Sequence, residues 1–138
     1  ELGLAAAARE YCRTCGERYP YEVEFDSSGF EKRLPPEVEI TAYRVLQEAL
    51  TNVARHAEAD LVKVALHMNS DSLQASVKDD GCGFDAKGVL SDPAKRGGLG
   101  LIGMQERASA VRGCAKISSH PGGGTCVELN IPLEEGPK

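Results

Sequence analysis

The sequence of 138 residues lacks the features that define several other protein classes. No apolar run approaches the roughly 20 residues that a membrane-spanning helix needs. The first residues also lack the charged and apolar segments of a signal peptide. Lysine and arginine number 16 against 21 acidic residues, which gives a net charge of −5. A general nucleic-acid-binding surface would be basic, so we expect no direct binding of nucleic acid.

The five cysteines lack the spacing of a disulfide framework. An odd number without such spacing indicates a reducing compartment. Cys12 and Cys15 form a CxxC pair, but a zinc site would need a second pair or histidines at ligand spacing. The pair therefore favours ordinary thiols on a helix over a metal site.

The composition is that of an ordinary soluble domain, with 41% hydrophobic and 27% charged residues. Its length predicts one domain that buries about two-thirds of its unfolded surface. Apolar residues recur at helical spacing in three segments. These are residues 4 to about 18, residues 36 to about 57 after Pro35, and a segment that starts at the Gly97–Gly100 cluster. Gly113 is the expected C-cap of the third helix.

Alternating apolar and polar residues predict five strands. The first lies at residues 21–25 and is followed by a turn at residues 27–29. Residues 62–68 and 73–79 form a hairpin around a turn at residues 69–71, and residues 114–119 and 125–132 form the last two strands. The expected fold is an α/β (α+β) two-layer sandwich, a mostly antiparallel sheet covered on one face by helices.

Two of these strands carry a polar side chain onto the predicted core face. Successive side chains alternate between faces, so Asp79 shares the face of Val77, and Thr125 shares the face of Val127. A buried carboxylate is costly unless a donor meets it, and a ligand amino group could be that donor. Gly81 and Gly83 follow directly and allow the backbone to approach a flat ligand. The pattern therefore predicts that Asp79 and Thr125 form the floor of a ligand pocket.

The second predicted helix offers a row of polar side chains. Glu48, Asn52 and His56 stand at i, i+4 and i+8. A carboxylate and a carboxamide one turn apart can hold Mg²⁺ directly or through water. A solvated helix edge explains the same row, since charged stripes usually face water.

Glycines also precede the third helix, at Gly97, Gly98 and Gly100. They leave backbone N–H groups free to bind phosphate oxygens at the helix start. The segment is not a P-loop, because no Gly-Lys-Ser/Thr follows. It does not fit a dinucleotide fingerprint either, because it follows a loop and not a strand.

Together these motifs resemble the GHKL ATPase superfamily, which includes gyrase, the ninety-kilodalton heat-shock chaperone, mismatch-repair ATPases and histidine kinases. Residues 47–57 resemble its N box, residues 79–84 its G1 box and residues 98–107 its G2 box. The resemblance covers about residues 35–133 and implies the Bergerat ATP-binding fold. The form G-L-x-G-M-x-E-R in the last box is similar to the nitrate-sensor and DesK-like subfamily of sensor histidine kinases.

The resemblance implies a role for each matching residue in binding ATP and Mg²⁺. Asp79 would accept from the adenine amino group, and Thr125 would support it through water. Asn52 would bind Mg²⁺, Glu48 would polarise the attacking histidine or a water, and His56 would approach the phosphates. Residues 84–97 would form a short lid without the separate phenylalanine box of many histidine kinases. The remaining expected nucleotide-binding residues are Gly81, Gly83, Gly98, Leu99, Gly100 and Leu101.

The resemblance also implies the protein's partners. Residues 1–19 resemble the join after the dimerisation helices, and residues 20–138 would be the ATP-binding catalytic domain. The γ-phosphoryl group would pass to a histidine on that dimerisation domain and then to a response regulator with a helix-turn-helix output domain. The whole kinase would be a cytoplasmic or membrane-anchored homodimer, and this chain alone a monomer.

Two alternatives share the same motifs. An anti-sigma-factor kinase has this fold and phosphorylates a serine on a partner protein, but the form of residues 104–107 and the apparent linker argue against it. A decayed kinase would be a nonenzymatic nucleotide-binding module. The presence of Glu48, Asn52 and Asp79 argues against decay.

Overall fold

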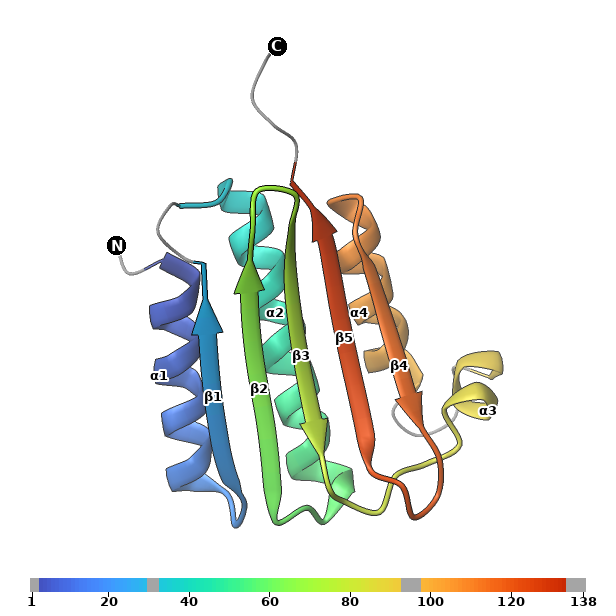
Figure 1. The fold of residues 1–138 in the computed structure, drawn as a ribbon. Helices are drawn as coiled ribbons and strands as arrows, with labels where there is room; N and C mark the ends of the chain where they lie inside the picture. Colours follow the sequence, from blue (N-terminus) through green and yellow to red (C-terminus); the bar gives the residue numbers. More distant parts are fainter. Residues whose placement is uncertain (1–2, 30–32, 93–97, 134–138) are drawn as a thin grey trace.

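The computed structural model describes residues 3–29, 33–92 and 98–133, apart from the side chains of residues 56, 57 and 98. The described strands form a five-stranded sheet in the order β1-β2-β3-β5-β4. β1 is parallel to β2, and the other neighbours are antiparallel. Helices cover one face of the sheet (Figure 1), which confirms the predicted two-layer sandwich. The strands are β1 (Glu22–Ser28), β2 (Leu61–Met68), β3 (Ser72–Asp79), β4 (Cys114–Ser119) and β5 (Thr125–Pro132).

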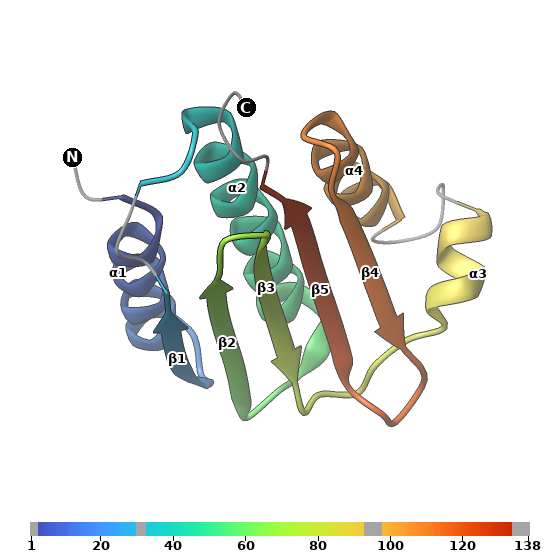
Figure 2. The same cartoon turned by 45° about the horizontal axis from the view of Figure 1, so that its top comes forward.

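Three helices form the second layer. α1 packs beside β1 at one edge, α2 crosses behind the middle strands, and α4 lies behind β4 and β5 (Figure 1). A short helix, α3, lies beyond β4 at the opposite edge from α1 (Figure 2). The helices are α1 (Gly3–Arg18), α2 (Pro36–Asn52) with a π-helical extension η1 (Val53–Ala57), α3 (Ala86–Ser91) and α4 (Gly98–Ala110).

The core lies between the helices and the sheet. β2 and β3 bury every second residue, as the two-residue period of a strand requires. The helices meet this face with their apolar stripes, so both layers exclude water from one continuous cluster. The largest fully buried side chains are Val45, Leu50, Val62, Val64, Leu66, Leu73, Met104 and Ile131.

Two predicted boundaries were wrong. Ser27 and Ser28 do not form a turn, because β1 continues through both and pairs them with Leu66 and His67 of β2. Gly113 is not the left-handed residue that ends α4, since that conformation belongs to Arg112, with φ 64. Gly113 comes next and donates its N–H to the carbonyl oxygen of Ala108 at 2.7 Å.

The second predicted helix does reach Ala57, but it changes its winding at Asn52. α2 ends there, and residues 53–57 form a π-helical turn. Such turns are rare and often occur at functional sites. The i+4 spacing that placed His56 in a row with Glu48 and Asn52 assumes α-helical winding. It therefore does not apply beyond Asn52.

α1 is part of the same core as the rest of the described chain. Its buried residues are Leu4, Ala8, Cys12 and Cys15. Burial raises the pKa of the Cys12 thiol to about 12, which keeps it protonated and unreactive. The helix also contacts α2 through the rings of Tyr11 and Tyr43, whose centroids are 5.9 Å apart. That residues 1–19 follow a dimerisation domain stays a prediction.

No helix in the described part of the chain has both the length and the apolar character to cross a membrane.

The residue that follows η1 provides a test of backbone strain. Glu58 has φ 51 and ψ 42, a left-handed conformation that costs a residue other than glycine roughly 1–2 kcal/mol. We expect Glu58→Gly to unfold at a higher urea concentration than Glu58→Ala, with a free energy of unfolding about 1 kcal/mol larger. Both variants remove the same exposed side chain, so the comparison isolates the backbone. Equal stabilities would contradict strain at this position.

Candidate functional site

The elements that carry the predicted polar residues end or begin at one end of the molecule. Figure 1 shows the end of α2, the start of α4, the end of β3 and the start of β5 at the same end. Within the sheet, Asp79 pairs with Val62 on one side and with Thr125 on the other. Thr125 pairs in turn with Ser119, the last residue of β4. Three polar side chains therefore lie next to one another, in one row across three adjacent strands, at this end of the sheet.

Asp79 is the buried polar residue of this row, with 6% of its surface exposed. Its inward orientation follows the alternation along β3, as predicted. One carboxylate oxygen, Oδ1, accepts the backbone N–H of Gly81 at 2.8 Å. Burial raises the pKa of Asp79, and the backbone N–H groups of Gly81 and Thr125 partly offset that rise. The carboxylate is therefore held in place by two backbone groups in a setting that disfavours its charge.

The loop after β3 is fastened to its neighbours on both sides. Asp80 accepts the backbone N–H groups of Asp60 and Leu61 at 2.9 and 3.1 Å. Gly83 and Gly124 both have positive φ, 67° and 71°. A side chain on Gly83 would overlap the backbone of the β4–β5 turn, and one on Gly124 would overlap the carbonyl of Asp79. These glycines are needed because two turns approach each other closely.

Ser119 is a site residue that the sequence analysis missed. Its hydroxyl accepts the N–H of Phe84 at 2.9 Å and donates to the carbonyl of Gly124 at 2.8 Å. It also lies 2.9 Å from the hydroxyl of Thr125. Ser119 therefore joins β4, the loop after β3 and the start of β5. The alternation along β4, in which Ala115 and Ile117 are buried, would have placed it inward.

Glu48 and Asn52 meet the start of α4. A side-chain carbon added to Gly100 would lie 2.8 Å from Oε2 of Glu48 and 3.8 Å from Nδ2 of Asn52. Both side chains are half-buried, so they are not the fully solvated helix edge that the alternative interpretation supposed. The missing side chain of Gly100 leaves room for a carboxylate and a carboxamide beside a helix N-terminus.

The other predicted residues lie in different settings. Leu101 is buried in the core, whereas Leu99 is one of the large apolar side chains that are exposed, at 76%. Gly98 is the first residue of α4. The side chain of His56 lies outside the described residues. Gly81 and Gly83 are half-buried beside Asp79.

The segment expected to form a lid is partly anchored. Residues 86–91 form α3, in which Ala86 is buried. Phe84, Val89 and Leu90 pack against the core, so the segment has more apolar contacts than its sequence suggested. Residues 93–97, which include Gly97, lie outside the described residues.

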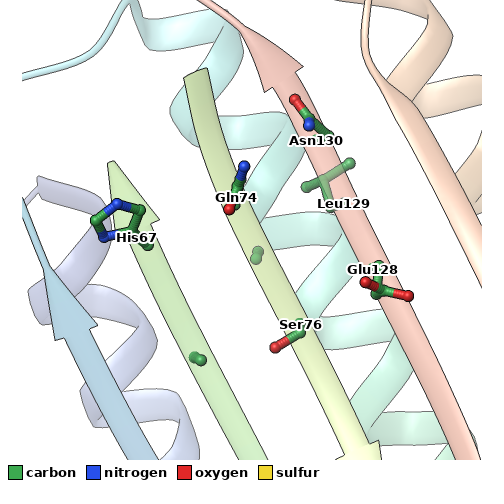
Figure 3. Close-up of a pocket in the computed structure, with 8 residues that line it drawn as sticks. His67, Gln74, Ser76, Glu128, Leu129 and Asn130 are labelled. Carbon is green, nitrogen blue, oxygen red and sulfur yellow. The ribbon is translucent and has the colours of Figure 1, made fainter. Parts of the chain in front are cut away.

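A shallow groove lies elsewhere, on the face of the sheet that carries no helices (Figure 3). The residues that line it include Ala65, His67, Gln74, Ser76, Glu128 and Asn130. None of the predicted site residues lines it. The side chains alternate along β2, β3 and β5, so this groove and the row of Asp79 lie on opposite faces.

The fold has a counterpart among the solved structures of histidine kinases. The chain resembles the histidine kinase domain of the blue-light activated histidine kinase from Erythrobacter litoralis EL346, with a TM-score of 0.75. The two are 20% identical, and the match covers 95% of this chain and 61% of that one. This likeness concerns the fold.

The chain belongs to the histidine kinase-, DNA gyrase B- and HSP90-like ATPase family, whose profile matches residues 37–135, well over half of the chain. It is also 38% identical over 135 residues to the oxygen sensor histidine kinase NreB of Staphylococcus carnosus (strain TM300). That match covers 98% of this chain and 38% of NreB, so the chain spans well under half of this relative. The resemblance stated from the motifs is confirmed.

Two glycines of α4 allow a test of the space beside Glu48. Alanine in place of a helical glycine stabilises a protein by about 1 kcal/mol when there is room. A side chain at Gly103 meets nothing within 4 Å, whereas one at Gly100 meets the Glu48 carboxylate. We expect Gly103→Ala to raise the free energy of unfolding in urea and Gly100→Ala to raise it less or lower it.

The position of a glycine within the helix also affects how much alanine changes the free energy of unfolding. The control therefore repeats both substitutions in a protein that carries Glu48→Ala. There the deficit of Gly100→Ala relative to Gly103→Ala should shrink. An unchanged deficit would show that the carboxylate is not what the added methyl group meets.

Proposed function

We propose that this domain binds MgATP and delivers the γ-phosphoryl group to a histidine on a separate dimerisation domain. The observation that carries the proposal is the buried carboxylate of Asp79, which pairs with Thr125 on the helix-covered face of the sheet and lacks a charged partner among the described contacts. A fixed acceptor of this kind fits the amino group of adenine. The family, whose members are ATPases by description, supports the same ligand.

The base end of the site would be formed by the sheet. Asp79 would accept from the adenine amino group, and Thr125 would support it through a water molecule. Gly81 and Gly83 would line the base, because their missing side chains allow the backbone to lie close to a flat ring. Guanine would bind poorly, since its carbonyl oxygen would face the carboxylate.

The phosphate end would be formed by the two helices. Gly98, Leu99, Gly100 and Leu101 occupy the first turn of α4, where free N–H groups favour phosphate oxygens. Asn52 would hold Mg²⁺, which supplies charge neutralisation for the phosphates when it is bound. Among the described residues, no group of three or more His, Cys, Asp or Glu side chains is placed to hold a metal. Phosphate oxygens and water would therefore complete its ligands.

Glu48 would act on the nucleophile. Its carboxylate lies beside Gly100, next to the helix start that would hold the phosphates. There it would accept a hydrogen bond from the incoming imidazole and orient the opposite ring nitrogen toward phosphorus. His56 would approach the phosphates from the turn after Asn52. The acceptor histidine itself would come from the dimerisation domain.

The wider setting follows from the same proposal. The phosphoryl group would pass from the dimerisation domain to a response regulator, with a helix-turn-helix output domain as its expected type. The whole kinase would be a homodimer in which this domain works in the cytoplasm, while this chain alone would be monomeric. Residues 1–19 would connect the two domains.

Replacing the buried carboxylate tests base recognition. Asp79→Asn should abolish ADP binding measured by calorimetry, because an amide offers no charge-assisted acceptor. ADP binding within about threefold of the wild type, on the order of 0.7 kcal/mol, would contradict the assignment.

The same variant has an internal control for folding. The pKa of Asp79 is raised in the folded protein, so its contribution to stability is present at low pH and is lost as the pH rises through that pKa. Asp79→Asn cannot ionise. At neutral pH it should be at least as stable as the wild type without nucleotide, and the difference should shrink on acidification.

Glu48 and Asn52 should separate chemistry from metal binding. Mixed with its dimerisation domain, the chain should phosphorylate that domain's histidine slowly, because the two are not tethered. Glu48→Gln should lower the transfer rate by about 10²–10⁴-fold with nearly unchanged ATP affinity.

Asn52→Ala should instead reduce the effect of Mg²⁺ on ATP affinity. Transfer by Glu48→Gln at the wild-type rate would rule out its role on the nucleophile, and acid-stable phosphoserine on a partner would favour the anti-sigma-factor alternative.

A further inference from the structure

We propose that Ser119 is a positioning residue for base specificity: it takes the hydroxyl proton of Thr125, so that Thr125 presents only acceptor lone pairs to the bound base. The proposal rests on the proposed function, because it concerns base selection in the same site. It adds Ser119 of β4, a residue that would not contact the base itself and would act on it only through the hydroxyl of Thr125.

The placement of Ser119 follows from the sheet register. Asp79, Thr125 and Ser119 are direct neighbours on three adjacent strands. All three lie on the helix-covered face, because each continues a line of buried residues along its strand. Ser119 and Thr125 are half-buried, so their hydroxyl groups are partly shielded from water and depend on protein partners.

Counting protons decides which hydroxyl donates. Ser119 has one hydroxyl proton and two lone pairs. The carbonyl of Gly124 can only accept, and it receives the Ser119 proton at 2.8 Å. The N–H of Phe84 can only donate, and it occupies one lone pair at 2.9 Å. The contact to Thr125, also 2.9 Å, is left with the second lone pair of Ser119. Thr125 must therefore supply the proton.

The direction of the hydrogen bond from Thr125 to Ser119 decides whether Thr125 can donate to a bound base. A hydroxyl that has given away its proton can only accept further hydrogen bonds. Thr125 then acts toward the ligand as a hydrogen-bond acceptor, as its neighbour Asp79 does. A ligand with an amino group supplies the donors that two acceptors need, directly or through a bound water. A ligand with a carbonyl oxygen at that place leaves acceptors facing acceptors.

Ser119 also joins three segments, so a purely structural role must be separated from this one. Loosening of the loops would weaken every nucleotide by a similar factor. A change in the polarity of Thr125 would instead alter the preference between an amino group and a carbonyl oxygen. The ratio of two affinities therefore distinguishes the two roles.

The experiment compares ADP with inosine diphosphate, which has a carbonyl oxygen in place of the amino group. Both affinities are measured by calorimetry on the wild-type chain and on Ser119→Ala. With Ser119 gone, the Thr125 hydroxyl can donate toward the ligand. The ADP preference should contract about five- to tenfold, the scale of one hydrogen bond. Equal losses for both nucleotides, or no change, would overturn the proposal.

Two variants serve as controls. Ser118→Ala makes the same substitution one residue earlier, on the exposed face of β4, and should leave the preference unchanged. Ser119→Thr keeps a hydroxyl at the site and should keep the preference. A contraction in Ser119→Thr as large as in Ser119→Ala would overturn the proton-accepting role.

Thr125→Val completes the cycle. This variant should lower the ADP affinity more than the inosine diphosphate affinity, and Ser119→Ala added to it should change the preference no further. If Ser119→Ala does not fold, Thr125→Val alone carries the test, and equal losses for the two nucleotides would overturn the proposal. Failure of the wild-type chain to bind ADP would instead contradict the proposed function, whatever the variants show.

Discussion

The structure of the site depends on burying the carboxylate of Asp79. A charge in this position is unfavourable unless donors surround it, and the chain supplies backbone N–H groups from Gly81 and Thr125. Supplying them requires two loops to converge on the end of β3. That convergence brings Gly124 so close to the Asp79 carbonyl that no side chain fits. The glycines of the site are thus a consequence of where the carboxylate is held.

A second constraint is the close approach of α2 and α4. Gly100 leaves space that the carboxylate of Glu48 and the carboxamide of Asn52 occupy. α2 ends at Asn52, and a π-helical turn follows, so the helix changes its winding beside this space. The candidate site therefore joins the end of β3 and the start of β5 with the start of α4, and one core holds both parts.

The elements that alternate regularly were predictable, and those governed by contacts between elements were not. Asp79 and Thr125 point inward because a strand alternates with a period of two, whatever lies opposite. The extension of β1 through Ser28 depends on pairing with β2, and serine residues alone suggested a turn. The π-helical winding after Asn52 leaves no mark in apolar spacing. Ser119 was missed because a serine at a strand end gains meaning only from Phe84, Gly124 and Thr125.

The sequence by itself determined the family and the two-layer architecture, because these follow from motifs of fixed spacing and from short-range periodicity. Tertiary structure alone decided how the motifs combine. It placed Glu48 and Asn52 against Gly100, and Asp79 beside Thr125 and Ser119. Such pairings join positions tens of residues apart, and strand register and helix packing set them. No local pattern encodes which hydroxyl gives its proton to which neighbour.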